Sequence, residues 1–160
     1  MLGWMILPLK RYAEFSGRSR RKEYWSFFLL NFIVVAVIVA IMFSVGGGLS
    51  QFASVNPANP LAVYGALFGG IGLLLAVWFV ATLIPNIAVN VRRLHDRNMS
   101  GWWYLGLIVL SIIPSSNTIL QLLQSVGSIA YLVLMFLPGT PGANKYGPDP
   151  KDPANVEVFS

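Results

Sequence analysis

Two long stretches of this chain carry no charged side chain. No Asp, Glu, Lys or Arg occurs from Tyr24 to Val91, or again from Asn98 to Asn144. A helix crosses the bilayer's hydrocarbon core with about 20 apolar residues, and both stretches are longer than that. We therefore predict an all-α integral membrane protein, in which the charges between the two stretches lie at a membrane surface.

The composition supports a single membrane domain over residues 1–160. Hydrophobic residues make up 56% of the chain and charged residues 11%, whereas an average soluble domain has about 25% charged residues. The longest polar stretches lie at the two ends, which leaves no room for a separate soluble domain. The net charge of +5 comes from cations that flank apolar spans, so we expect contact with lipid and not with nucleic acid.

The apolar pattern predicts a four-helix transmembrane bundle. Its spans are expected near residues 24–45, 61–91, 102–114 and 117–137. Gly46–Gly48 should end the first span. The helical pattern of the second continues to about Leu94, which is too long for a membrane, so this helix must tilt, bend at Pro85 or project into the cytoplasm. Pro114 makes the third span short, unless it only kinks the helix and residues 115–118 lie in space covered by protein.

The segment before the first span has two open interpretations. Pro8 stands where a helix could begin, and Leu9, Tyr12 and Phe15 recur at a spacing of three residues. This pattern favours a short helix lying in the membrane interface. The alternative is an N-terminal tail that rests on lipid without helical structure.

The distribution of cations predicts the orientation. Of the 11 Lys and Arg residues, six precede the first span, three lie between the second and third spans, and two follow the fourth. The loops on the opposite side contain none. By the positive-inside rule, both termini and the loop around Arg92–Arg97 should be cytoplasmic.

Polar side chains form two predicted stripes on the apolar helices. The stripe residues are Asn31, Thr82, Asn86, Asn90, Gln121, Gln124 and Ser128. Helical spacing places Asn86 and Asn90 on one face, at a depth that allows them to meet Asn31 inside the bundle. We expect hydrogen bonds between helices there.

The charged motif after the second span contains an adjacent His95 and Asp96. That pair suits acid–base chemistry, but the chain has one His and no Cys, so we predict no catalytic residue, metal ligand or cofactor-binding residue. A structural interpretation is favoured. In it, Arg92 pairs with Asp96 within its own helix, and Arg93 pairs with Glu23 of the first span.

The remaining charged and aromatic residues at this end predict a cationic rim that binds anionic lipid or a protein partner. Its members are Arg18, Arg20, Arg21, Lys22, Arg92, Arg97, Trp102 and Trp103.

Three patches resemble, in order, the signatures of a known family. They are SGRSRRKEYW (Ser16–Trp25), VRRLHDRNMSGWW (Val91–Trp103) and PGTPGANKYGPDP (Pro138–Pro150). The family is that of bacterial inner-membrane proteins with the domain of unknown function 805, the YhaH-like group. The resemblance implies a small multi-pass protein of the bacterial inner membrane, and it implies no activity.

Three classes of function follow from these features. We expect a non-enzymatic scaffold or accessory subunit whose cationic rim engages anionic headgroups, a larger membrane complex or a homo-oligomer. The alternative is a small transporter or channel that uses the polar stripes, although no Asp or Glu lies inside any predicted span. A membrane enzyme is the least favoured class.

Overall fold

The computed structural model describes residues 2–45, 55–56, 58–68, 72–114 and 117–152. Within these ranges the secondary structure is helical, and the only pairing of extended residues is an isolated bridge between Asn144 and Gly147. The helices are α1 (Leu2–Lys10), α2 (Arg21–Val45), α4 (Pro60–Phe68), α5 (Gly72–Asp96), α6 (Trp102–Ile112) and α7 (Thr118–Phe136). The predicted all-α class is therefore confirmed for this part of the chain.

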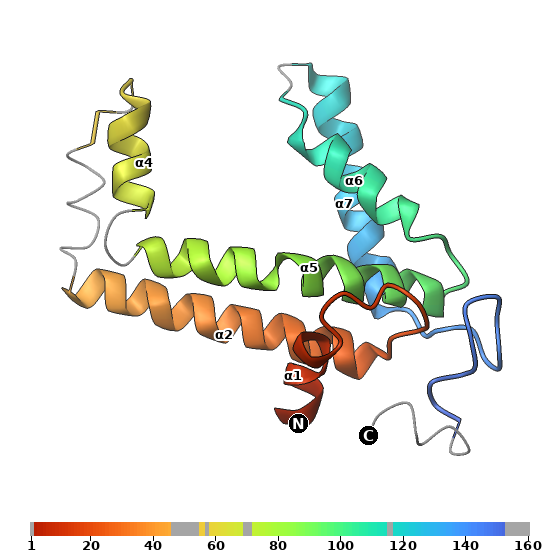
Figure 1. Ribbon diagram of the computed structural model, residues 1–160. Helices are drawn as coiled ribbons and strands as arrows, with labels where there is room; N and C mark the ends of the chain where they lie inside the picture. The colour runs from red at the N-terminus through yellow and green to blue at the C-terminus, as the bar shows by residue number, and fades with distance from the viewer. Residues whose placement is uncertain (1, 46–54, 57, 69–71, 115–116, 153–160) are drawn as a thin grey trace.

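The two longest helices, α2 and α5, run side by side in opposite directions (Figure 1). Helix α5 continues through Pro85 and ends where Asn98 adopts a left-handed φ of 59°. The amide of Met99 then donates to the carbonyl of Leu94 at 3.0 Å, the hydrogen bond that closes a Schellman-type helix end. The chain can therefore turn away from α5 directly after the charged motif.

Helices α6 and α7 form a hairpin that leaves the α2–α5 pair steeply (Figure 1). The hairpin is attached at its base, where the rings of Trp25 and Phe136 lie 4.3 Å apart. This arrangement does not confirm the predicted four-helix bundle, because the far parts of the hairpin extend away from α2 and α5. Helix α6 spans Trp102–Ile112, which at about 1.5 Å per residue is only half of the bilayer core.

Among the described residues, the structure contains three helices that are long and apolar enough to cross a membrane. They are Arg21–Ser44, Gly72–Asp96 and Thr118–Phe136. The predicted second span, near residues 61–91, is replaced by two helices, α4 and α5, which point in different directions (Figure 1). Periodicity alone suggested one helix because the apolar sequence is uninterrupted. The predicted end of the first span at Gly46–Gly48 lies outside the described residues.

The N-terminal segment is helical, but its helix precedes the predicted start. Helix α1 covers Leu2–Lys10 and contains the buried Pro8 near its end, and the turn that follows includes Tyr12. The helix packs across both α2 and α5. This packing stabilises a helix whose sequence signal was weak.

Candidate functional site

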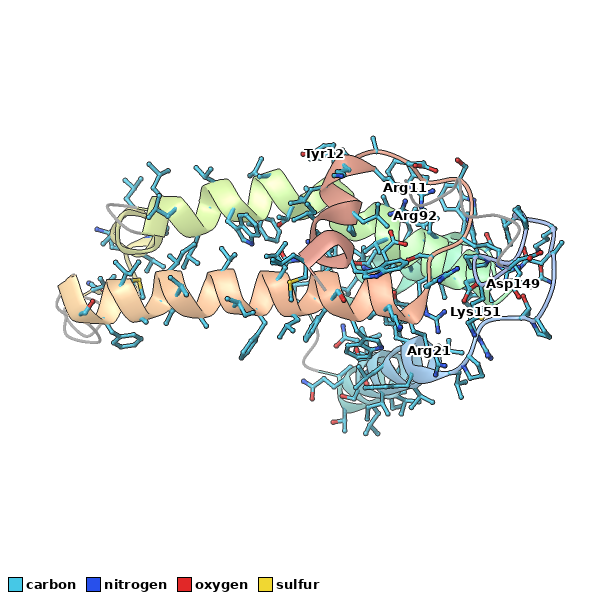
Figure 2. All side chains as sticks on the ribbon, turned by 90° about the horizontal axis from the view of Figure 1, so that it is seen from below. Arg11, Tyr12, Arg21, Arg92, Asp149 and Lys151 are labelled. Atoms are coloured by element: carbon cyan, nitrogen blue, oxygen red, sulfur yellow. The ribbon has the colours of Figure 1, made fainter. Side chains whose placement is uncertain are left out.

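Five charged side chains are buried together at one end of the α2–α5 pair, and we call them the ion-pair cluster. They are Arg18, Glu23, Arg92, Arg93 and Asp96, all less than 5% exposed. Figure 2 shows Arg92 at this end, close to the labelled Arg11, with Arg21 on the other side of the α2 ribbon. Buried charges are tolerated only when they are paired and hydrogen-bonded. The partners of each charge therefore define what holds this end of the molecule together.

Arg18 joins the three signature patches. Its Nε donates to Oδ1 of Asp96 at 3.0 Å, at the end of α5. Its Nη1 and Nη2 donate to the carbonyls of Gly142 and Thr140 at 2.5 and 2.6 Å, in the segment after α7. A guanidinium can serve several acceptors in one plane because its N–H groups form a rigid fork. One side chain thus connects the N-terminal segment, α5 and the C-terminal segment.

Arg92 and Glu23 form the second part of the cluster. Nη2 of Arg92 donates to Oε1 of Glu23 at 2.9 Å, and both side chains are fully buried. This ion pair joins the last turns of α5 to the first turn of α2. Because α2 and α5 are antiparallel, the pair closes the charged end of the two longest helices.

Arg93 is turned about 100° from Arg92 around α5 and connects this helix to α7. Its Nη1 donates to Oδ2 of Asp96 at 2.5 Å, and its Nη2 donates to the carbonyl of Met135 at 3.3 Å and to that of Leu137. Those carbonyls lie at the C-terminal end of α7, where the helix dipole favours a cation. Arg93 therefore neutralises Asp96 and at the same time caps the C-terminal end of α7.

The predicted pairing of these residues is wrong, because the two arginines have exchanged partners. Arg92, not Arg93, contacts Glu23, and Arg93, not Arg92, contacts Asp96. The prediction directed both Asn90 and Arg93 toward the first span, whereas the structure turns them toward α7, where the Tyr131 hydroxyl donates to Oδ1 of Asn90.

Two members of the predicted cationic rim are also misplaced, because Arg18 and Arg92 are buried in the cluster and cannot face lipid headgroups. Arg97 is half-buried and donates to the carbonyl of Pro138 at 2.5 Å. Arg20 is half-buried and lies over the ring of Trp4. The predicted rim residues that are exposed are Arg21, Lys22, Trp102 and Trp103.

The C-terminal segment wraps around the end of α5, a role that sequence analysis did not assign. The amide of Thr140 donates to the carbonyl of Asp96 at 2.8 Å, and Nδ2 of Asn144 donates to the carbonyl of His95 at 2.9 Å. These carbonyls have no partner within the helix. The sequence did mark this segment, because it is the third of the patches that resemble the family. Its turn-forming residues, however, are also typical of a C-terminal tail without tertiary contacts.

The backbone of this segment passes very close to the cluster. A Cβ added at Gly139 would overlap the carboxylate of Asp96. Gly101, directly before α6, is similarly crowded, because a Cβ there would lie 2.6 Å from Cγ1 of Val91. Both glycines are required by close approach of the chain to α5.

His95 is held between the N-terminal and C-terminal segments. Its ring stacks on that of Tyr146 with centroids 3.8 Å apart, and its Nδ1 lies 3.2 Å from the carbonyl of Gly17. These contacts agree with a structural role for this side chain.

A smaller ion pair lies beside the cluster. Nε of Arg11 donates to Oε2 of Glu14 at 2.6 Å. The hydrogen bond from Arg11 lowers the pKa of Glu14, and the same bond raises the pKa of Arg11. Glu14 also lies 4.0 Å from Nη1 of Arg92, so it adds a second carboxylate on the outer side of that arginine.

The predicted polar stripes bond mainly within their own helices. Nδ2 of Asn86 donates to the carbonyl of Thr82 at 2.8 Å, and Nδ2 of Asn90 donates to that of Asn86 at 2.7 Å. Asn31 does not meet either of them, contrary to expectation, because its Oδ1 accepts from Nε1 of Trp78 at 3.2 Å. The partner of Asn31, the indole of Trp78, lies nearer the start of α5 than Asn86 and Asn90 do.

The second stripe connects α7 to α6. Nε2 of Gln124 donates to the carbonyls of Leu110 and Ile113 at 2.7 and 2.9 Å. Ser128 is exposed and its hydroxyl donates to the carbonyl of Gln124 at 2.8 Å, while Gln121 is also exposed. This stripe therefore stabilises the end of the α6–α7 hairpin, where α6 leaves carbonyls without helical partners.

What the cluster can do chemically follows from these contacts. Its carboxylates accept from arginines and its arginines donate to carboxylates and carbonyls, which fixes the relative positions of α2, α5 and α7. In the part of the chain that the structure describes, no group of three or more His, Cys, Asp or Glu side chains is placed to hold a metal ion. The geometry is that of a structural junction.

Comparison with known proteins places this junction in a family context. Residues 12–148 match the family described as "Protein of unknown function (DUF805)". The inner membrane protein YhaH of Escherichia coli K12 is 34% identical over 150 residues, which cover 94% of this chain and 98% of YhaH. The inner membrane protein YhaI of the same strain is 35% identical over 152 residues, which cover 95% of this chain and 98% of YhaI.

A third relative, the uncharacterized protein YiiR of Escherichia coli K12, is 31% identical over 152 residues, covering 87% of both chains. No solved structure matches this chain significantly.

Proposed function

Because this chain belongs to the DUF805 family, whose relatives include named inner membrane proteins, we propose that it is a non-enzymatic, multi-pass scaffold of the bacterial inner membrane. Its exposed cations at the cytoplasmic end engage anionic lipid or a membrane-protein partner. In the second case the protein is an accessory subunit of a larger complex.

The observation that carries this proposal is the position of Arg18. This cation looks from sequence like a surface residue, yet it is 4% exposed and bonds to Asp96, Thr140 and Gly142. These contacts give the arginine, the carboxylate and the turn-rich C-terminal segment a structural role that requires no catalytic activity. It supports a rigid junction that presents the remaining cations outward.

The proposed topology places both termini in the cytoplasm. The start of α2, the end of α5 and the end of α7 converge at the ion-pair cluster. This convergence supports an even number of crossings, with α6 leaving the cluster and α7 returning to it. The positive-inside rule then supports the cytoplasmic side for the cluster.

Cysteine labelling tests that orientation directly, since the chain has no native cysteine. We expect Asn56→Cys, in the exposed turn before α4, to react with an impermeant thiol reagent in intact cells. Ala143→Cys, in the exposed C-terminal segment, should react only after the inner membrane is opened. Reversed labelling would contradict the orientation.

The scaffold role is tested by neutralising Arg21 and Lys22 together, the exposed cations of the predicted rim. We expect Arg21→Gln/Lys22→Gln, purified from native membranes in mild detergent, to lose most of the anionic lipid or the stoichiometric protein that accompanies the wild type. The same purified proteins should show no solute flux in liposomes. An unchanged lipid and protein complement in the double variant would refute the role of these cations.

The transporter alternative gains no support from a specific contact. The stripe amides of Asn86 and Asn90 are used by carbonyls of α5 and by Tyr131. Internal bonding of this kind stabilises helices in a membrane.

A further inference from the structure

A groove between the start of α2 and the end of α7 has the features of a lipid site, and we name it the α2–α7 groove. It is lined by Arg21, Lys22, Trp25, Ser26, Leu29 and Phe136, with a volume of about 510 Å³. Small-molecule sites in proteins have volumes of roughly 300–1,000 Å³. We propose that this groove binds one anionic phospholipid, an inference that rests on the proposed function and makes it specific.

The charges at the mouth of the groove suit a phosphate. Arg21 and Lys22 are adjacent and both exposed, and no carboxylate is among the described lining residues. The nearest acidic residue in the sequence, Glu23, is buried on another face of α2 against Arg92. The mouth therefore presents two cations whose charge is not cancelled within the groove, and guanidinium and ammonium groups bind phosphate oxygens strongly.

The position of Arg21 is fixed by α7. Its Nη1 donates to the carbonyl of Phe136 at 3.2 Å, one of the acceptors at the C-terminal end of that helix. A guanidinium has five N–H donors, so this bond orients the group while donors remain for a headgroup. The bond also connects the two walls of the groove at its charged end.

Below the cations, the walls are apolar. The rings of Trp25 and Phe136 lie 4.3 Å apart, and the exposed fraction of Leu29 is 37%. From Arg21 to Leu29 the helix rises about 12 Å, so the groove passes from headgroup level into the upper part of a leaflet about 15 Å deep. Tryptophan is enriched at this boundary.

The order of side-chain types along the groove favours an anionic phospholipid as its occupant. The cations Arg21 and Lys22 come first, the paired rings of Trp25 and Phe136 follow at the interface, and the aliphatic side chain of Leu29 comes last. An anionic phospholipid has the complementary order, with phosphate, glycerol backbone and acyl chain. A protein segment would have to supply the same order while competing with lipid at a groove that opens beside membrane-type helices.

The proposal is tested by native mass spectrometry of the full-length protein in mild detergent, titrated with dioleoyl phosphatidylglycerol. Dioleoyl phosphatidylethanolamine provides the zwitterionic comparison, and inorganic phosphate tests the headgroup charge alone. Three variants are compared with the wild type. Arg21→Gln/Lys22→Gln removes the groove cations, Lys10→Gln/Lys151→Gln removes two exposed cations elsewhere, and Leu29→Trp obstructs the apolar part without a change of charge.

We expect one phosphatidylglycerol per wild-type chain, bound at least tenfold more tightly than phosphatidylethanolamine. Arg21→Gln/Lys22→Gln should weaken this binding about tenfold, because each cation near a headgroup contributes measurably. Leu29→Trp should weaken it several-fold, and the Lys10→Gln/Lys151→Gln control should not change it. Inorganic phosphate should not displace the lipid, since it lacks the acyl chain.

Three results would overturn the groove, and the first two also separate it from the broader function. Equal losses in Arg21→Gln/Lys22→Gln and Lys10→Gln/Lys151→Gln would mean that the rim binds anionic lipid diffusely, so the proposed function would stand and the groove would fail. Phosphatidylglycerol binding unchanged in every variant would refute the groove and leave a protein partner as the only form of the proposed function. Equal affinity for phosphatidylglycerol and phosphatidylethanolamine would mean that the groove binds lipid through its apolar walls and does not select the headgroup charge.

Discussion

The two halves of α5 contrast sharply in what surrounds them. In the first half, Val77, Phe79 and Val80 are 58–66% exposed, although all are apolar. In the second half, Arg92 and Arg93 are fully buried, although both are charged. The usual relation between polarity and exposure is thus reversed along one helix.

The contrast follows from the two environments of a membrane protein. Lipid chains are as apolar as the side chains of the first half, so burying those side chains against another helix gains little. Charges near the membrane surface instead require partners. Among the residues that the structure describes, the buried side chains therefore gather mainly at the charged end. Stability should depend more on the ion pairs there than on apolar contacts elsewhere.

The largest expected effect is the loss of Asp96, the carboxylate shared by Arg18 and Arg93. Asp96→Asn leaves both buried cations without a paired carboxylate and with carbonyl acceptors alone, and removing one member of a buried pair costs about 3–5 kcal/mol. The free energy of unfolding can be measured by denaturing-detergent titration. As a control, Asp149→Asn changes a carboxylate that accepts backbone hydrogen bonds in the C-terminal segment, and it should cost less than about 1 kcal/mol.

A double-mutant cycle on Glu23 and Arg92 distinguishes the observed pairing from the predicted one. Glu23→Gln and Arg92→Gln should each destabilise the protein, while the double variant should lose less than the sum, with a coupling of about 0.5–3 kcal/mol. The matched cycle with Glu23→Gln and Arg93→Gln should be nearly additive. Strong coupling in the second cycle and none in the first would restore the predicted pairing.

Gly139→Ala tests the close passage of the C-terminal segment over α5. The added methyl group would overlap the Asp96 carboxylate, so the segment or the cluster must shift, at a cost of about 1–3 kcal/mol. Gly106→Ala is the control, since a Cβ at that position in α6 meets no atom within 4 Å. The control should be neutral or stabilising, because Ala favours helix more than Gly.

The smallest effect is expected in the lipid-facing part of the α2–α5 pair, where Asn31 and Trp78 share a hydrogen bond of 3.2 Å. Asn31→Leu should cost about 0.6 kcal/mol, the average for a hydrogen bond between membrane helices. Phe32→Leu, at a neighbouring position that is 64% exposed, should change stability even less. A loss for Asn31→Leu as large as that for Asp96→Asn would remove the contrast between the two halves.

The helix bounds show which features of secondary structure could be predicted from local sequence. The range predicted for the last span, near residues 117–137, agrees closely with α7, because Asn117 accepts from the amide of Ile119 and caps the helix. The predicted second span failed, since α4 and α5 are separate helices joined by a segment whose composition is also apolar. Apolar composition determines which segments favour the membrane, and it carries little information about where a helix turns.

The sequence by itself determined the class of protein, the charged end and the residues that gather there. The length of the charge-free stretches and the positions of the cations determine which segments enter the lipid and which stay at its surface. That partition does not depend on which helices pack against one another. Tertiary structure decided which arginine meets which carboxylate. A rotation of α5 about its axis by one residue's angle, about 100°, exchanges Arg92 and Arg93, and that rotation is set by the packing of α2 and α7 on its two sides. The burial of Arg18 was decided in the same way, because its acceptors at Asp96, Thr140 and Gly142 come together only when the two ends of the chain fold onto α5.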